Sequence, residues 1–580
     1  MDSSPRHNGN RGSKRRVFPF VCCLGTVLAA SFCLASEEAE IAVEYQFEAI
    51  SFEQHHVLDP ERGEFRSSQE VLIKNTSDTA ADSIAFNSHP SLAIVDLSVS
   101  DDKGTGIAVG PPQVRGGATV FRDYVFDVIE VDLRTSVKPG ETVIFHIEYE
   151  LKADGALDAP RDMYEFTVSP QACYSVYIGC NPLFGSASGA PYEMTVRYPK
   201  DYVLCVPGEL VASTMVDGEH VDTYRSPAPL QPSFACARYR KVVKSDKRVT
   251  LEYYLYPQEE FDDEMARITF EILSLYTKSF GSRGDDGYRY ATVGPVNAPY
   301  PSGENKGATN FVTDFAAREF NAESPDGLLS YFRLMSHELY HKWNLGDVTW
   351  ADSRLFEWFG EGGANFVSAW AAERIVGLDA GAKIRRRYSE GVVRSECQQL
   401  DVTLENVTKT GGAEDHLLYN YGALIWEQLR QRLGDEAFGA GLSDFYAKYA
   451  GRQVLAEDLL ACLQARTPVN VTAYLEQFTQ HNARIDLSIG KVVTSAEADR
   501  WVSTVEILVE SDRDYELTTS IGVRSADGET ETTPIKLTGG GNHTFVVTSS
   551  AQPETVVVDP HFRVPQTDLE NDVWSTAPTS

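Results

Sequence analysis

The sequence predicts a multidomain α+β protein in which a β-rich part, an α-rich part and a second β-rich part follow one another. Its 580 residues are too many for one ordinary domain, since a domain has about 150 residues. Hydrophobic periodicity changes from strand-like alternation to helical spacing near Gln258, and returns to alternation near Ile485. Apolar residues make up 42% of the chain, enough to build several cores and to exclude wholesale disorder.

The first 35 residues have the order of a secretory signal peptide. The basic stretch Lys14-Arg15-Arg16 precedes an apolar run over residues 17–35, and small residues near Ala35 and Ser36 offer a cleavage site. The run is just long enough for an uncleaved anchor helix, and the paired arginines also resemble a twin-arginine export signal. We expect residues 1–35 to be a signal peptide of an exported, periplasmic or extracellular protein. Membrane attachment is expected only if the leader stays uncleaved.

Residues 36–256 are predicted to form an N-terminal β domain. Short alternating runs such as 71–73, 142–147 and 250–254 contain β-branched and aromatic residues. Clusters of Gly, Pro, Asp and Asn separate these runs and are typical of turns.

Residues 257–484 are predicted to form an α-rich domain. The segment from Phe261 to Phe280 carries apolar residues at helical spacing, and three further helices are predicted at 326–344, 355–376 and 417–434. Strand patterns return at 485–564, which we expect to be a C-terminal β domain. The polar tail, 565–580, is predicted to be loose.

The charge of the chain excludes one large class of partners. There are 84 acidic against 52 basic residues, so the formal net charge is -32. Such an acidic surface repels phosphate backbones, and we expect no binding of nucleic acid.

Cysteine spacing bears on metal binding and on disulfides. Six cysteines follow the leader, and their even number in an exported protein permits disulfides, with Cys173–Cys180 as the local pair. No close CxxC pair exists, so a thiolate zinc site is not expected.

The sequence His337-Glu338-Leu339-Tyr340-His341 is an HExxH motif in a predicted helix. Positions four apart share one helix face, so both imidazoles can bind one zinc ion. Glu338 can act on a zinc-activated water without being a ligand. A catalytic zinc needs a third protein ligand, for which Glu361 is the first candidate and Glu357, one helical turn earlier, the second.

These residues resemble a known group of zinc peptidases. The HExxH motif with Trp343, followed by Trp358-x-x-Glu361-Gly362, is similar to the aminopeptidase N family and to the related glycyl aminopeptidases. The resemblance implies a zinc ion bound by His337, His341 and Glu361, with Glu338 as general base. Nineteen residues separate His341 from Glu361 where the aminopeptidase N pattern has eighteen, so Glu357 stays open as a ligand.

The resemblance extends to two flanking segments. Residues 302–309, which include Gly303 and Glu304, resemble the family's GAMEN strand, which implies that they bind the substrate and that Glu304 holds its free amino terminus. Downstream, residues 419–424 resemble the family's Tyr-x-Lys-Gly-Ala run, which implies that Tyr419 stabilises the oxyanion of the reaction. Tyr421, in place of the usual lysine, is the alternative.

The similarity also implies a finer architecture: an N-terminal β saddle, a thermolysin-like catalytic domain and a C-terminal β-sandwich. The function expected is that of an exported zinc aminopeptidase acting on peptides with a free amino terminus. Two alternatives remain open: an endopeptidase or other hydrolase on the same scaffold, and a catalytically inert peptide-binding protein.

Overall fold

The computed structural model describes residues 45–576 apart from short gaps, and all structural statements refer to these residues. The gaps are 122–123, 152–165, 177–178, 185–188, 262, 283–286, 295–302, 307–308, 321–324, 346–347, 351–357, 408–411, 498, 526–527 and 529. The predicted signal peptide lies outside the described residues. No helix among the described residues is long and apolar enough to cross a membrane.

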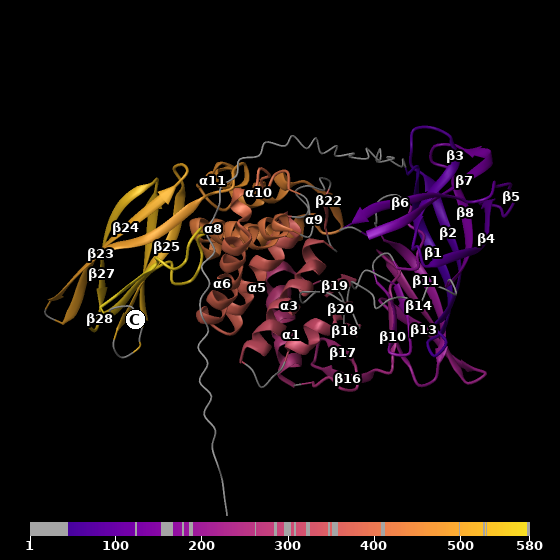
Figure 1. Ribbon diagram of the computed structural model, residues 1–580, viewed down its shortest axis with the longest axis horizontal. Helices are drawn as coiled ribbons and strands as arrows, with labels where there is room; N and C mark the ends of the chain where they lie inside the picture. Colours follow the sequence, from indigo (N-terminus) through magenta and orange to yellow (C-terminus); the bar gives the residue numbers. More distant parts are fainter. Residues whose placement is uncertain are drawn as a thin grey trace, which may run out of the picture. The chain divides into compact units, whose positions relative to one another are not determined.

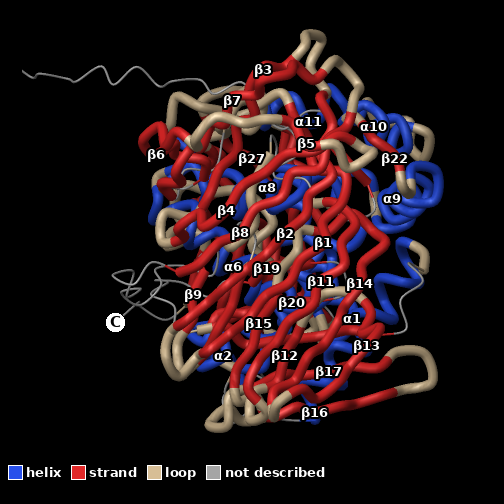
Figure 2. Tube along the Cα trace, turned by 90° about the vertical axis from the view of Figure 1, so that its right-hand side faces the viewer, coloured by secondary structure: helices blue, strands red, loops and turns tan. Residues whose placement is uncertain are grey.

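The chain is a mixed α+β protein with strands first, helices in the middle and strands again at the end, as predicted (Figure 1). Its first part contains an eight-stranded sheet whose order is β13 (Glu209–Val216), β14 (Glu219–Leu230), β11 (Ala190–Pro199), β1 (Phe47–Asp59), β2 (Glu64–Asn75), β8 (Thr142–Leu151), β4 (Leu92–Asp101) and β5 (Gly106–Ile107). Figure 2 shows these strands side by side. Burial alternates residue by residue along β8, because successive side chains of a strand point to opposite faces.

Two smaller sheets complete the first part. One has the order β3 (Ala81–Ser88), β7 (Tyr124–Val137) and β6 (Gln113–Phe121). The other has the order β12 (Val203–Cys205), β15 (Phe234–Ala237), β10 (Ala172–Ser175) and β9 (Phe166–Val168).

The described cysteines of this part are buried and free, so the Cys173–Cys180 pairing that the sequence permitted is not formed. Cys173 on β10 lies opposite Cys236 on β15 in the antiparallel register. Cys180 was chosen as the neighbour of Cys173 because the two are close in the sequence. Which side chains lie opposite each other in a sheet depends instead on strand pairing, which places Cys236 there.

His56 on β1 makes this part sensitive to acid. Its side chain is 1% exposed, it packs between the rings of Phe65 and Phe234, and neither ring nitrogen has a hydrogen-bond partner. Burial, with a smaller effect from His55, lowers the pKa of His56 to about 3. Below pH 6.5 the unfolded chain therefore takes up a proton that the folded chain takes up only near pH 3. Stability contributed by the neutral ring is present above pH 6.5 and is lost as the pH falls, at about 1.4 kcal/mol per pH unit.

We expect a His56→Leu variant to lose less stability between pH 6.5 and pH 5 than the native chain, by up to about 2 kcal/mol. Urea unfolding at the two pH values measures this difference. The neighbouring His55 is exposed, so His55→Leu serves as the control and is expected to follow the native chain. Parallel pH dependence in the native chain and the His56→Leu variant would contradict the expectation.

A five-stranded sheet begins the central part. Its order is β16 (Arg240–Ser245), β17 (Thr250–Leu255), β18 (Gly287–Val293), β20 (Thr309–Thr313) and β19 (Gly303–Lys306). The predicted boundary after residue 256 therefore divides this sheet, and β16 and β17 pair with the central part rather than with the N-terminal sheet. Alternation along β17 predicted a strand correctly, but it carried no information about the partner strand.

Helices form the rest of the central part. The predicted helices are found as α1 (Asp263–Phe280), α3 (Pro325–Asn344), α5 (Gly363–Ile375) and α8 (Gly422–Leu433). Two π-helical turns precede α5 and α8, namely η1 (Trp358–Gly362) and η3 (Leu417–Tyr421). The remaining longer helices are α6 (Leu378–Ser395), α9 (Asp435–Tyr449), α10 (Ala456–Gln464) and α11 (Val471–Thr479). Apolar faces of α1, α3, α5 and α8 share one core with β17.

Two antiparallel sheets form the C-terminal part. One has the order β23 (Ile485–Glu497), β24 (Arg500–Ser511) and β27 (Gly541–Ser549). The other has the order β26 (Thr530–Thr538), β25 (Glu516–Ser525), β28 (Pro553–Val558) and β29 (Val573–Ser575).

Strand β29 lies in the segment that was predicted to be a loose tail, so that prediction is wrong for this strand. It pairs with β28, and the side chain of Gln566 is buried and donates to Asp572 at 2.9 Å. Polar composition suggested a solvated tail, but buried hydrogen bonds hold these polar side chains in place.

Candidate metal centre

Helix α3 carries the HExxH motif. The segment before the motif contains apolar residues at helical spacing and no interrupting Gly or Pro after Gly327, so the helix continues to Asn344. His337 and His341 are 7% and 9% exposed and lie one above the other on the same face of α3. Their Nε2 atoms are 3.1 Å apart.

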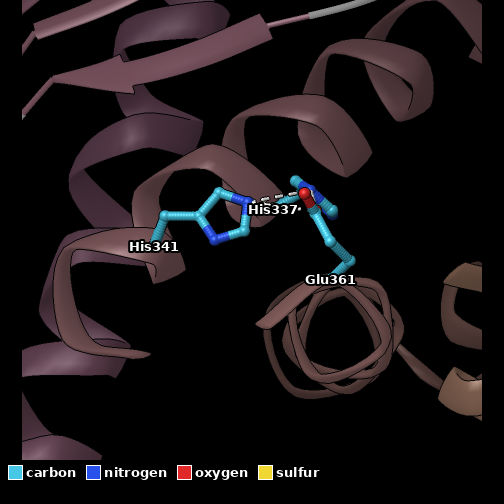
Figure 3. Close-up of side chains that lie close together, drawn as sticks. All are labelled: His337, His341 and Glu361. Carbon is cyan, nitrogen blue, oxygen red and sulfur yellow. Dashed lines mark hydrogen bonds and ion pairs between the residues drawn. The ribbon is translucent and has the colours of Figure 1, made fainter. Parts of the chain in front are cut away.

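Glu361 reaches the same point from a second element. It lies in the π-helical turn η1, and its Oε2 atom is 3.2 Å from Nε2 of His337 and 3.4 Å from Nε2 of His341. Figure 3 shows the two imidazoles and the carboxylate pointing toward one another. One ligand atom from each of the three residues lies within 4.8 Å of the other two. In the part of the chain that the structure describes, no other group of three or more His, Cys, Asp or Glu residues converges in this way.

Two glycines allow η1 and η3 to contact each other beside this centre. A Cβ atom on Gly362 would lie 2.8 Å from the carbonyl oxygen of Leu418, and one on Gly422 would lie 2.6 Å from a ring carbon of Trp358. Both distances are too short for a side chain. The glycines thus permit the close approach that brings the Glu361 turn next to the Tyr419 turn. Single π-helical turns within helices are frequent at functional sites.

Two asparagines determine which nitrogen of each histidine carries the proton and which one faces Glu361. Asn365 donates through Nδ2 to the carbonyl of Tyr419 at 3.1 Å, so its Oδ1 faces Nδ1 of His337 at 3.0 Å. Asn344 donates to the carbonyl of Gly360 at 2.8 Å, and its Oδ1 faces Nδ1 of His341 at 3.2 Å. An amide oxygen only accepts, so each Nδ1 carries the proton and each Nε2 presents a lone pair. This is the arrangement of metal-binding histidines.

The donor set fits zinc. A tetrahedral ion with bonds of about 2.0–2.1 Å places its ligand atoms about 3.3 Å apart, and the three separations here are 3.1, 3.2 and 3.4 Å. Two lone pairs and a carboxylate that converge in a buried place repel one another unless a cation lies between them. Two histidines and one glutamate also leave a fourth coordination position, as catalytic zinc requires.

The electrostatics of His337 agree with a neutral imidazole. Burial lowers the pKa of His337, and the neighbouring His341 lowers it further, while Glu361 acts in the opposite direction. A neutral imidazole is the form that binds a metal.

The other residues predicted for the site are Glu338, Gly303, Glu304 and the alternative ligand Glu357. Glu338 follows His337 on α3 and is 4% exposed. Gly303 and Glu304 belong to β19, the edge strand of the central sheet, which contacts α3. The alternative ligand Glu357 lies outside the described residues.

Tyr419 and Tyr421 have different surroundings. The ring of Tyr419 stacks on His337, with centroids 6.0 Å apart and planes at 15°. Tyr421 is fully buried, donates to the carbonyl of Phe478 and accepts from the amide of Ala483. Between the two, only Tyr419 lies beside the candidate ligand His337, which leaves Tyr421 as a core residue.

Asn344 and Asn365 are the functional residues that the sequence analysis missed. Each follows a proposed ligand on a helix, Asn344 three residues after His341 and Asn365 four residues after Glu361. The spacing could have predicted the contact of Asn344, because Asn344 and His341 lie on the same helix. It could not have predicted the contact of Asn365, because Asn365 contacts His337 on a different helix.

We expect an Asn365→Ala variant to bind zinc about 10–100-fold more weakly, because the orientation and tautomer of His337 are then no longer fixed. Competition with a zinc chelator measures the change. Asn420→Ala is the control, since Asn420 on η3 contacts His416 at 2.8 Å and no proposed ligand. Equal zinc affinity of the two variants would remove the supporting role of Asn365.

Comparisons with known proteins agree with this centre. Residues 285–478 match the peptidase family M1 domain. Aminopeptidase 2, mitochondrial, from Saccharomyces cerevisiae is 21% identical over 318 residues, which cover 51% of this chain and 32% of that protein. Aminopeptidase M1-B from Oryza sativa subsp. japonica is 25% identical over 150 residues, which cover 25% of this chain and 17% of that protein. The matched regions span at most about a third of either relative.

The matched segment contains α3, η1 and η3, and therefore all the residues that converge at the metal centre. The family predicted from the HExxH motif and its flanking segments is confirmed to this extent: the central part of this chain matches the peptidase family M1 domain, and both relatives are named as aminopeptidases.

Proposed function

We propose that the chain is an exported zinc aminopeptidase that removes the first residue from peptides. One observation carries this proposal: His337, His341 and Glu361 present three ligand atoms at zinc-like separations inside a peptidase family M1 domain. The two relatives are both named as aminopeptidases, which supports the same activity. Export is supported by the leader alone, and the saddle, thermolysin-like and sandwich architecture by the family resemblance.

Each chemical role goes to a named residue. His337, His341 and Glu361 would hold a zinc ion, which would supply the Lewis acid for activating water and polarising the peptide carbonyl. Glu338 accepts the proton of the attacking water and passes it to the leaving amine. Tyr419 donates its hydroxyl to the developing oxyanion, a task suited to a phenol that stays protonated near pH 7. Glu304 holds the ammonium group of the substrate and so limits cleavage to the first peptide bond.

The test combines metal content with turnover of aminoacyl amides that have either a free or an acetylated amino terminus. We expect about one zinc ion per chain, hydrolysis of the free compounds and no hydrolysis of the acetylated ones. Equal hydrolysis of both sets would instead indicate an endopeptidase or another hydrolase. Bound zinc without any turnover would indicate a peptide-binding protein.

A further inference from the structure

Arg333 extends the metal-binding row of α3 by one turn toward the helix N-terminus. Residues 333, 337 and 341 are four positions apart, so their side chains lie along one face of the helix. The carbonyl of Arg333 accepts hydrogen bonds from Ser336 at 3.1 Å and from Ser368 on α5 at 3.2 Å. The position of Arg333 is therefore tied to α3, which carries both histidines, and to α5, which follows the Glu361 turn η1.

The Arg333 guanidinium has no acidic partner in the part of the chain that the structure describes, although its side chain is half-buried. Other buried arginines of this domain are paired: Arg385 and Arg430 lie 2.9 and 2.7 Å from Glu373. The charge of Arg333 acts against the burial that raises the pKa of Tyr388 on α6, so its guanidinium lies in the neighbourhood of this ring.

A second arginine approaches the same place from α6. Arg387 is exposed, and its Nη1 atom donates to Ser330 on α3 at 3.2 Å. Ser330 precedes Arg333 by three residues, about one turn of the helix. Burial raises the pKa of Tyr388 to about 12, and the charge of Arg387, like that of Arg333, acts in the opposite direction. Neither arginine forms an ion pair among the described residues. Two arginines from different helices, Arg333 on α3 and Arg387 on α6, thus act on the same buried ring.

Unpaired arginines next to the centre are unexpected in this chain. Acidic residues outnumber basic ones by 84 to 52, so a nearby carboxylate is easily supplied for an arginine that needs one for stability. A planar guanidinium matches a carboxylate with two parallel hydrogen bonds, and such charge-assisted pairs are strong when partly shielded from water. A half-buried arginine without a partner is suited to a carboxylate that arrives with a ligand.

The separation between Arg333 and the metal centre corresponds to the length of a few extended peptide residues. Arg333 and His337 are separated by about 6 Å along the helix axis. An extended peptide advances about 3.3–3.6 Å per residue. A carboxylate two or three residues beyond the cleaved bond, or at the end of an acidic side chain beside it, is therefore within reach of a long arginine side chain.

We propose that Arg333, assisted by Arg387, forms a subsite for a carboxylate of the peptide substrate. This inference rests on the proposed function, because it assumes that a peptide binds at the centre of His337, His341 and Glu361. The carboxylate belongs either to the C-terminus of a short peptide or to an acidic side chain. The subsite makes such peptides the preferred substrates of the enzyme.

The test measures binding to the zinc-loaded full chain carrying Glu338→Gln, so that bound peptide is not consumed. Calorimetry compares trialanine, its C-terminal amide, and two amides that carry aspartate at the first or second position. We expect at least one of the three carboxylate ligands to bind about tenfold more tightly than the neutral amide, as one charge-assisted pair permits. The ligand that gains affinity identifies the source of the carboxylate.

Binding by substituted chains then tests whether the arginines cause the tighter binding of the carboxylate peptides. Arg333→Gln is expected to abolish it, Arg333→Lys to restore part of it, and Arg387→Gln to reduce it. Arg386→Gln is the matched control, because Arg386 is exposed on the same helix and pairs with Glu390. Equal affinity for all four peptides, no binding of any of them, or a preference that survives Arg333→Gln overturns the inference.

Failure of the inference and failure of the proposed function give different results. Hydrolysis of trialanine amide by the native chain, with equal affinity for charged and neutral peptides, supports the function and overturns the subsite. An arginine-dependent preference in the Glu338→Gln chain, without hydrolysis by the native chain, supports the subsite and overturns the function.

Discussion

Replacing Glu338 with glutamine is expected to lower kcat by about 10²–10⁴-fold while the protein keeps its zinc. The amide has nearly the shape of the carboxylate but does not take a proton from water. Glu338 is not one of the three residues whose ligand atoms converge, so the metal site stays intact. Metal analysis and steady-state kinetics of one preparation measure both quantities.

The control for this substitution is Glu390→Gln on α6, where the carboxylate pairs with exposed Arg386 and is not part of the metal centre. Its kcat is expected to match that of the native chain. If peptide hydrolysis persists at the native rate after Glu338→Gln, the mechanism assigned to this carboxylate is wrong.

Replacing Glu361 with alanine is expected to weaken zinc binding strongly. Loss of a residue that only supports a ligand weakens binding by about 10–100-fold, and loss of the ligand Glu361 is expected to exceed this. The change removes the only carboxylate among the three convergent ligands, and with it the negative charge that helps to neutralise the ion. Activity is expected to disappear at zinc concentrations that saturate the native chain. Chelator competition and thermal unfolding with and without zinc measure the loss of binding.

Glu357→Ala is the matched control, because Glu357 precedes Glu361 by four residues in the sequence and was the alternative ligand. Its zinc affinity is expected to equal that of the native chain. The opposite result, with zinc lost from Glu357→Ala and kept by Glu361→Ala, would exchange the roles of the two residues.

Local patterns predicted the elements that carry the site. The helical spacing of apolar residues was enough to predict α1 and α3, because one turn of helix repeats every 3.6 residues whatever the partner. The HExxH motif likewise placed His337 and His341 on one helix face. These predictions succeeded because the interacting residues are close neighbours in the sequence.

Predictions about which segments of the chain lie next to each other were less successful. The sequence suggested Cys180 as the neighbour of Cys173, whereas strand pairing places Cys236 opposite it. Composition suggested a loose tail after residue 564, whereas β29 extends the last sheet. In both cases the outcome depends on segments that meet only when the chain folds.

The order of β-rich and α-rich parts, the histidine pair, and Glu361 as a candidate third ligand could all be predicted from the amino-acid sequence. Three further features became visible only in the folded chain: η1 brings Glu361 to 3.2 Å from His337, Asn365 orients this histidine, and Tyr419 rather than Tyr421 lies beside it. The physical reason is that periodicity is a property of one segment. Distances between segments depend on close packing, here on the small volume of Gly362 and Gly422 where η1 and η3 meet.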